Sequence, residues 1–286
     1  MQNNCYYFCF ILFPLNRLGI CFFCLFLCWI NHGSRSFRLP EMVIFRNQQR
    51  QEMNIAIILA GGSGSRLGGD LPKQFIKVAG KTIIEHTLDV FEHHPQIDEI
   101  AVVSRPDFIP TVRQIVSDGG YTKVRQVLPG GKERYDSSLS ALRAYTNDDD
   151  NLLLHDAVRP LVSHRIISDC ISALDTYEAV DVATMTTDTI VQVDDNNCIA
   201  AIPPRQYLRN VQTPQCFRRS TIMRAYELAL QDPEFVTTDD CGVVKKYLPE
   251  VPIFIVKGEP TNIKVTYAED LFLMERLCMT RDLGQG

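Results

Sequence analysis

The chain has 286 residues, of which 45% are hydrophobic and 22% are charged, a composition that favours a folded α/β protein over a disordered one. Its formal net charge is -5 at pH 7, which excludes a broad basic surface for coating nucleic acid. A local cluster of lysines and arginines remains compatible with binding one small anionic ligand.

Residues 1–52 form an apolar leader that differs from the rest of the chain. Segment 5–30 is almost wholly apolar and holds five of the ten cysteines. Three interpretations stay open: a membrane anchor, since about 20 residues span a bilayer; a signal peptide, although no basic region precedes the apolar run; and a misassigned start, with translation beginning at Met53. We expect the third, which predicts a cytoplasmic protein with one domain over residues 53–286.

From Asn54 onward, short apolar runs alternate with amphipathic stretches. Four runs predict buried strands: 55–59, 99–104, 124–128 and 152–154. Three stretches with apolar residues at helical spacing predict helices: 83–91, 112–116 and 139–142. Strands that alternate with helices are parallel and joined by right-handed crossovers, so we expect a Rossmann-like, doubly wound α/β fold with a mostly parallel sheet.

The second half of the domain departs from this alternation. Two extended runs, 188–193 and 198–202, flank the turn-forming segment Asp194-Asp195-Asn196-Asn197. They predict a β-hairpin arm around 187–204 that projects from the sheet. A strand at 253–256 and a helix from Ala268 close the domain, and the scattered later cysteines predict reduced thiols.

A glycine-rich loop, LAGGSGSRLGGDLPKQF (59–75), follows the first predicted strand, so its backbone N–H groups can face an anion. It does not match a dinucleotide fingerprint, because Leu67 occupies the position of the third glycine, nor a P-loop, because no Gly-Lys-Ser/Thr ends it. Arg66 and Lys73 instead bring two positive charges to a triphosphate that loses pyrophosphate. The alternative is a surface turn with two solvated basic residues.

Two further segments place polar groups at strand ends, where open α/β sheets bind ligands. PGGKERYDSS (129–138) adds a second glycine turn and two hydroxyls, and LLLHDAVRP (152–160) runs from a strand into Asp156 and Arg159. Taken alone, Asp156 also suits a helix N-cap. We expect His155 to be a packed structural histidine and His93-His94, at the end of a helix, to be solvated, so no catalytic histidine is predicted.

Five motifs in order, AGGxGxR-x(5)-PKQ, GGxxR, HDAxRP, TPQxF and NIKxT, resemble the cytidylyltransferases that act on polyol phosphates, over residues 54 to about 277. That family includes enzymes for ribitol 5-phosphate and for 2-C-methyl-D-erythritol 4-phosphate. The resemblance implies that a phosphate oxygen of the polyol attacks the α-phosphate of CTP in line and releases pyrophosphate. Mg²⁺ is expected mostly on the phosphate oxygens, and no general base is required.

The resemblance also implies roles for individual residues. Arg66, Lys73 and Lys264 would neutralise the transition state. The residues that would bind CTP are Leu59, Ala60, Gly61, Gly62, Gly64, Arg66, Lys73, Gly131 and Ser137, and those that would bind the polyol phosphate are Asp156, Thr189, Arg205, Thr213 and Lys264. Asp156 is in addition the one candidate metal ligand, and Arg159 would order its turn. Because Thr189 and Arg205 lie on or beside the arm, the resemblance implies a homodimer in which one subunit reaches over the acceptor site of the other.

The acceptor is the least determined part of this interpretation. DTIVQV (188–193) lacks the lysine or arginine that follows the Asp-Thr of the arm in erythritol-phosphate enzymes, and TTDDCGVV (237–244) and SHRII (163–167) resemble the ribitol-phosphate branch. We therefore favour ribitol 5-phosphate and keep 2-C-methyl-D-erythritol 4-phosphate as the alternative. Two alternatives come from other classes: an NAD-binding oxidoreductase, which Leu67 and Arg66 oppose, and a membrane-tethered binding protein, which rests wholly on residues 5–30.

Overall fold

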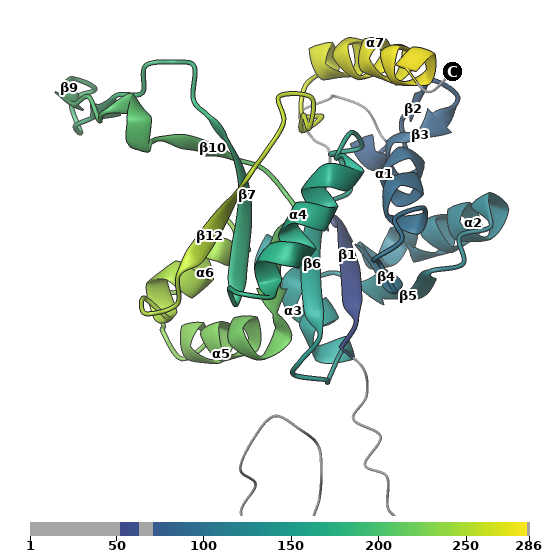
Figure 1. The fold of residues 1–286 in the computed structure, drawn as a ribbon, viewed down its shortest axis with the longest axis horizontal. Helices are drawn as coiled ribbons and strands as arrows, with labels where there is room; N and C mark the ends of the chain where they lie inside the picture. Colours follow the sequence, from purple (N-terminus) through teal and green to yellow (C-terminus); the bar gives the residue numbers. More distant parts are fainter. Residues whose placement is uncertain (1–51, 63–70, 285–286) are drawn as a thin grey trace, which may run out of the picture. The chain divides into compact units, whose positions relative to one another are not determined.

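The computed structural model describes residues 52–62 and 71–284, and an eight-stranded mixed sheet organises them (Figure 1). Side chains are described as far as Thr280. The predictions made for residues 1–51, and for Gly64, Arg66 and Leu67 within the glycine-rich loop, lie outside the described residues.

Four parallel strands form the centre of the sheet, in the order β6-β1-β4-β5. They are β1 (Asn54–Ala60), β4 (Glu99–Ser104), β5 (Val124–Pro129) and β6 (Asn151–Asp156). Every residue of β6 is buried, as is every residue of β1 after the first, because helices cover both faces of the sheet. All four strands were predicted from their continuous apolar runs, and the prediction is confirmed.

The three predicted helices connect these strands: α1 (Ile83–Glu92), α2 (Ile109–Gly119) and α3 (Arg134–Ala144). Helix α1 begins with a capping box, in which Thr82 Oγ1 accepts from the Glu85 N–H and the Glu85 carboxylate accepts from the Thr82 N–H. Helix α2 is followed by Gly120, whose φ of 65° lies in the left-handed region that ends many helices. Helices α1 and α2 pack on one face of the sheet and α3 on the other, as a doubly wound fold requires.

Several elements of the second half were not predicted. They are the helices α4 (His164–Leu174), α5 (Arg219–Ala229) and α6 (Asp240–Tyr247) and the strands β7 (Ala179–Met185), β10 (Arg209–Val211) and β11 (Gln215–Arg218). Strand β11 pairs antiparallel with both β6 and β7, and β10 pairs antiparallel with the end of β7. The predicted strand β12 (Ile253–Lys257) then pairs parallel with β7. The sheet is therefore mixed at this side and parallel at its centre.

The predicted hairpin arm is present, with a shorter ladder than its sequence suggested. Strands β8 (Gln192–Val193) and β9 (Ile199–Ala201) pair antiparallel. Asp194 Oδ1 accepts hydrogen bonds from the N–H groups of Asn196 and Cys198, which closes the predicted turn. Residues 187–202 are all exposed, and Figure 1 shows the hairpin held away from the sheet on extended segments.

Short elements and one terminal helix complete the described fold. These are η2 (Lys73–Phe75), β2 (Lys77–Val78), β3 (Lys81–Thr82), η3 (Pro106–Phe108), η4 (Arg205–Tyr207) and α7 (Ala268–Gly284). The five cysteines of the described region are free thiols, as predicted, and Cys198 is the exposed one. Over the same residues, no helix combines the length and the apolar character needed to cross a membrane.

Candidate active site

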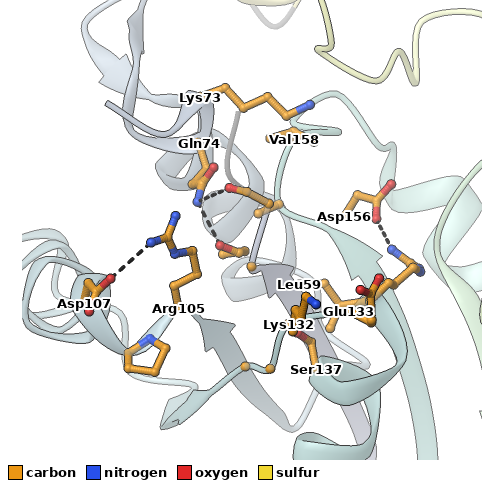
Figure 2. A pocket seen from close by; sticks show the side chains of 18 of the residues that line it. Leu59, Lys73, Gln74, Arg105, Asp107, Lys132, Glu133, Ser137, Asp156 and Val158 are labelled. Carbon is orange, nitrogen blue, oxygen red and sulfur yellow. Dashed lines mark hydrogen bonds and ion pairs between the residues drawn. The ribbon is translucent and has the colours of Figure 1, made fainter. Parts of the chain in front are cut away.

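The carboxyl ends of the four central strands border a cavity of about 850 Å³ (Figure 2). The described residues that line it are Leu59, Ala60, Gly61, Gly62, Lys73, Gln74, Arg105, Pro106, Asp107, Gly130, Gly131, Lys132, Glu133, Arg134, Ser137, Asp156, Ala157, Val158 and Lys264. This is the edge at which an open α/β sheet is expected to bind its ligand. The cavity thus brings together most of the predicted CTP-binding residues with Asp156 and Lys264.

Gln74 ties the first glycine loop to the segment that carries Lys73. Its Nε2 donates to the carbonyl oxygens of Ala60, at 2.8 Å, and Gly62, at 3.3 Å, and the side chain is 2% exposed (Figure 2). These bonds hold the end of β1 next to η2, so that Lys73 and the loop face the same cavity. Gln74 belongs to the PKQ motif, but no role was predicted for it, although buried loop carbonyls usually need a hydrogen-bond donor of this kind.

The second glycine turn approaches the first one around Ser137. A Cβ atom added to Gly130 would lie 2.7 Å from Ser137 Oγ, and one added to Gly61 would lie 3.1 Å from the same atom. A Cβ atom at Gly131 would lie only 2.2 Å from the Cβ of Asp136. A side chain at Gly130 or Gly131 would therefore force the first turn of α3 to shift, whereas Gly61 has only little spare room beside Ser137. The predicted nucleotide residues Gly131 and Ser137 lie together as a result.

Asp156 ends β6 as a buried carboxylate surrounded by three positive charges. Its Oδ1 accepts from Arg134 Nη1 at 2.6 Å, its Oδ2 lies 2.9 Å from Lys264 Nζ, and Arg159 Nε lies 3.7 Å from Oδ2. Burial by itself raises the pKa of the Asp156 carboxyl, but the charges of Arg134, Lys264 and Arg159 outweigh it and hold that pKa well below its usual range. Asp156 is therefore ionised at neutral pH.

Asp156 is not a helix N-cap. Helix α4 begins after Ser163, whose Oγ accepts from the N–H of Ile166, so the capping role belongs to that serine.

A buried layer beneath Asp156 fixes its backbone. Thr213 Oγ1 accepts from the Asp156 N–H at 3.2 Å and lies 3.0 Å from His155 Nδ1. His155 is fully buried, its Nε2 lies 3.0 Å from the Arg159 carbonyl oxygen, and burial lowers its pKa to about 4. The prediction of a packed structural histidine is confirmed. Thr213, predicted to bind the acceptor, lies under Asp156 and outside the described cavity lining.

Arg159 extends the same support, as predicted for the residue that orders this turn. Its N–H donates to the Asp156 carbonyl oxygen at 3.0 Å, and its Nη1 donates to the carbonyl oxygen of Asn262 at 2.9 Å. Asn262 is fully buried and precedes Lys264 by two residues, so the Asp156 turn and the segment that carries Lys264 are fastened together.

Three basic residues of the cavity were not predicted from the sequence. Arg105 follows β4, Lys132 lies in the second glycine turn, and Arg134 begins α3. With Lys73 and Lys264, they give five described basic side chains in the lining, against the acidic Asp107, Glu133 and Asp156. Figure 2 shows Arg105 and Asp156 on opposite sides of the cavity. Because positive charge prevails along its wall, the cavity suits an anionic ligand such as a triphosphate. Arg134 stands in the GGxxR motif, which was the available signal for it.

Thr189 and Arg205, the predicted acceptor-binding residues of the arm, contact each other and are not among the residues described as lining the cavity. Arg205 Nη2 donates to Thr189 Oγ1 at 3.1 Å, and both side chains are exposed.

The prediction that His93 and His94 are both solvated is wrong for His94. Its side chain is fully buried, and its Nε2 lies 3.2 Å from the carbonyl oxygen of His164 and 3.1 Å from Ser168 Oγ. Helix α4, which was not predicted, covers the end of α1 at this point.

Of the three acidic residues described in the cavity lining, one is a buried carboxylate. Asp156 is buried, whereas Asp107 and Glu133 are exposed. Across the described ranges, no group of three or more histidine, cysteine, aspartate or glutamate side chains gathers to hold a metal. Any metal ion in the cavity would therefore take most of its ligands from phosphate oxygens and water, as Mg²⁺ commonly does.

Comparisons with known proteins agree with this geometry. The model of the family IspD, 2-C-methyl-D-erythritol 4-phosphate cytidylyltransferase, matches residues 54–280. A protein of that name from Thermobifida fusca (strain YX) is 48% identical over 231 residues, which cover 79% of this chain and 93% of the relative. The bifunctional ribulose 5-phosphate reductase/CDP-ribitol pyrophosphorylase Bcs1 of Haemophilus influenzae is also 48% identical over 231 residues, which cover 80% of this chain and 48% of Bcs1.

Solved structures show the same fold. The crystal structure of 4-diphosphocytidyl-2C-methyl-D-erythritol synthase from Anaerococcus prevotii DSM 20548 has a TM-score of 0.71 at 33% identity, covering 80% of this chain and 96% of that one. The 2-C-methyl-D-erythritol 4-phosphate cytidylyltransferase of Thermus thermophilus has a TM-score of 0.61 at 27% identity, covering 79% and 98% of the two chains. With its motifs, cavity and fold in agreement, this chain belongs to the IspD family and is a CTP-dependent cytidylyltransferase.

Proposed function

We propose that this cytidylyltransferase transfers CMP from CTP to ribitol 5-phosphate, forming a CDP-polyol and releasing pyrophosphate. The observation that carries the reaction is a cavity in which two glycine turns, several basic side chains and a buried carboxylate converge. Glycine turns leave backbone N–H groups open to phosphate oxygens, and fixed positive charges stabilise the charge that develops on a transferring phosphoryl group.

Each part of the cavity has a distinct task in this proposal. Lys73 and Lys264, together with Arg66, stabilise the negative charge of the transition state. The two turns that meet at Ser137 bind the nucleotide, with Gly131 and Ser137 beside the cytosine. Asp156 contacts the hydroxyl groups of the acceptor. The attacking phosphate is already ionised near neutral pH, so positioning and charge stabilisation suffice and no side chain has to remove a proton.

Mg²⁺ is the metal that we propose for the reaction. It would neutralise part of the charge on the CTP phosphates, and Asp156 is the protein residue that we propose as its ligand. We place the reaction in the cytoplasm.

We further propose that the enzyme acts as a homodimer, with Thr189 and Arg205 of one subunit gripping the acceptor phosphate of the other. Three observations support this. The two residues contact each other, they lie outside the described cavity wall of their own chain, and their arm exposes Ile190, Val191, Val193, Ile199 and Ile202. Exposed apolar side chains gathered on a projecting segment are typical of a surface that another protein covers.

One specific observation favours each acceptor. The described arm, residues 187–204, contains no lysine or arginine before Arg205, a departure from the erythritol-phosphate pattern that supports ribitol 5-phosphate. The family model and the Thermobifida relative support 2-C-methyl-D-erythritol 4-phosphate, the second candidate.

Pyrophosphate release decides between them. The purified protein is given CTP and Mg²⁺ with each acceptor in parallel, and the two kcat/KM values are compared. A higher kcat/KM for ribitol 5-phosphate is expected. A higher value for the erythritol compound would reassign the acceptor and keep the chemistry, and release with neither compound would refute both acceptors.

A further inference from the structure

Arg134 connects the cavity to a second carboxylate buried behind it. One end of its guanidinium contacts Asp156, and its other terminal nitrogen, Nη2, lies 3.2 Å from Asp240 Oδ2. The side chain of Asp240 is 1% exposed, against 26% for Arg134. Asp240 begins α6 and is not among the described cavity-lining residues, and its described contact with the cavity lining is Arg134.

Asp240 is itself held from the other side. Its Oδ1 accepts from the hydroxyl of Tyr226 at 2.7 Å, and its N–H donates to Gln215 Oε1 at 3.0 Å. Burial raises the pKa of the Tyr226 hydroxyl and the charge of Asp240 raises it further, so the tyrosine remains a neutral donor. A chain of contacts, Tyr226–Asp240–Arg134–Asp156, therefore connects α5, α6, α3 and the end of β6.

Stability alone is a weak reason for such an arrangement. Burying a carboxylate and a guanidinium removes both from water, and that cost commonly cancels the attraction between them. A buried pair can, however, fix the orientation of a side chain. The guanidinium is planar with its nitrogens in a fixed fork, so fixing one end at Asp240 fixes the line along which the other end meets Asp156.

The orientation of Arg134 matters because the other close partner of Asp156, Lys264, can be drawn away from it. Lys264 is 45% exposed, and once a phosphate enters the cavity, its ammonium group has a second anion to bind. Asp156 would then lose one of its close partners at the moment when it has to meet the acceptor. Arg134 is expected to stay in contact with Asp156 when a phosphate binds, because its ion pair with the buried Asp240 holds it in place.

We propose that Arg134 and Asp240 are positioning residues, in which Asp240 holds Arg134 and Arg134 holds the Asp156 carboxylate in place when Lys264 turns to a phosphate. This inference rests on the role proposed above for Asp156.

A control cluster lies where α6 meets the segment that follows α5. Tyr247 donates to Asp232 Oδ2 at 2.5 Å, and Lys246 Nζ lies 3.0 Å from the same oxygen. This cluster repeats the combination of tyrosine, aspartate and cation, and none of its three residues is among those described as lining the cavity.

The experiment compares Asp240→Asn with Asp232→Asn in the full-length protein. Asparagine keeps the size of the side chain and an oxygen for the tyrosine, but removes the charge that faces the cation. For Asp240→Asn we expect kcat to fall about tenfold or more, as happens when the residues that orient a metal-binding side chain are removed, while the KM for CTP changes little. Asp232→Asn should retain the kcat of the wild type.

A double-mutant cycle with Asp156→Asn separates positioning from general loosening of the structure. If Asp240 acts through Asp156, adding Asp240→Asn to Asp156→Asn costs far less than it does in the wild type. An undiminished loss in that background would overturn the proposal, as would wild-type kcat in a folded Asp240→Asn variant. Wild-type kcat in Asp156→Asn alone would overturn the proposed role of Asp156 as well, which distinguishes the two failures.

A second variant covers the case in which Asp240→Asn does not fold. Arg134→Lys keeps the positive charge on the cavity wall but cannot contact two carboxylates with a fixed fork. We expect it to remain folded, with a lowered melting temperature because one buried carboxylate loses its cation, and to lose kcat to a similar extent. Wild-type kcat in Arg134→Lys would overturn the proposal.

Discussion

Lys264 Nζ lies 2.9 Å from Asp156 Oδ2, so a basic residue after β12 and an acidic residue at the end of β6 meet in one cavity. The pair joins the cation proposed for charge stabilisation to the carboxylate proposed for acceptor binding. Lys264 would bind a phosphate of the substrates, and Asp156 would bind a hydroxyl group of the acceptor.

The first prediction concerns the two described lysines of the cavity. Lys73→Ala and Lys264→Ala should each lower kcat about 100-fold or more, because both lysines stabilise charge that develops in the transition state. The measurement is pyrophosphate release at saturating CTP and acceptor, with thermal unfolding as a check on folding. The controls Lys77→Ala and Lys257→Ala remove exposed lysines nearby in the chain, outside the described lining, and should retain wild-type kcat. Wild-type kcat in both cavity variants would refute the assigned roles.

The second prediction concerns the arm. Arg205→Ala should raise the KM for the polyol phosphate about tenfold and leave the KM for CTP nearly unchanged, because a charge-assisted contact to the acceptor phosphate is lost. Arg209→Ala is the control: Arg209 is also exposed, and its Nη1 donates to backbone carbonyl oxygens of residues 206 and 208. Steady-state kinetics with each substrate varied in turn give the result. An effect confined to the KM for CTP would contradict the assignment of the arm.

The third prediction concerns Gln74. Gln74→Ala removes two hydrogen bonds to the first glycine loop and leaves the Ala60 carbonyl without this donor, so the free energy of unfolding should fall by about 1–3 kcal/mol. The KM for CTP should rise, because the loop is no longer fastened beside Lys73. Denaturant unfolding and CTP kinetics test the two effects separately. An unchanged KM together with the loss of stability would limit Gln74 to a structural role.

The fourth prediction concerns the dependence of stability on pH between about 4 and 6.5. Burial lowers the pKa of His155 to about 4 from its usual 6.5, so the unfolded chain takes up a proton in this window while the native one does not. The His155 contribution therefore falls as the pH falls, by about 3 kcal/mol at 1.36 kcal/mol per pKa unit. Burial raises the pKa of Asp181 to about 6 from 3.8, so the native state is the one that binds the proton, and this contribution is lost as the pH rises from 3.8 to 6.

The two residues therefore oppose each other, and Asp181→Asn should expose the effect of His155. In that variant the free energy of unfolding should rise more steeply between pH 4 and pH 6 than it does in the wild type. Urea unfolding at several pH values measures both slopes. Equal slopes would show that Asp181 does not titrate differently in the native and unfolded states.

What the sequence by itself determined is the parallel centre of the fold and the chemistry along its edge. Continuous apolar runs such as 55–59 and 152–154 identify strands buried on both faces, and the alternation with helices makes those strands parallel. Parallel strands end at one edge of the sheet, so Gly61, Lys73, Gly131, Ser137 and Asp156 were expected to converge, and the cavity gathers all five.

Only the tertiary structure decided which segments cover one another. Strands β10 and β11 are short and enter the sheet antiparallel, and their place depends on pairing with β7 and β6 more than on a local pattern. His94 was expected to be solvated because its own helix ends there, and it is buried because α4 packs over it. The partnership of Arg134 with Asp240 joins residues distant in the chain. Periodicity reports which face of a segment is buried, whereas partners and charges at a site depend on contacts that no local pattern encodes.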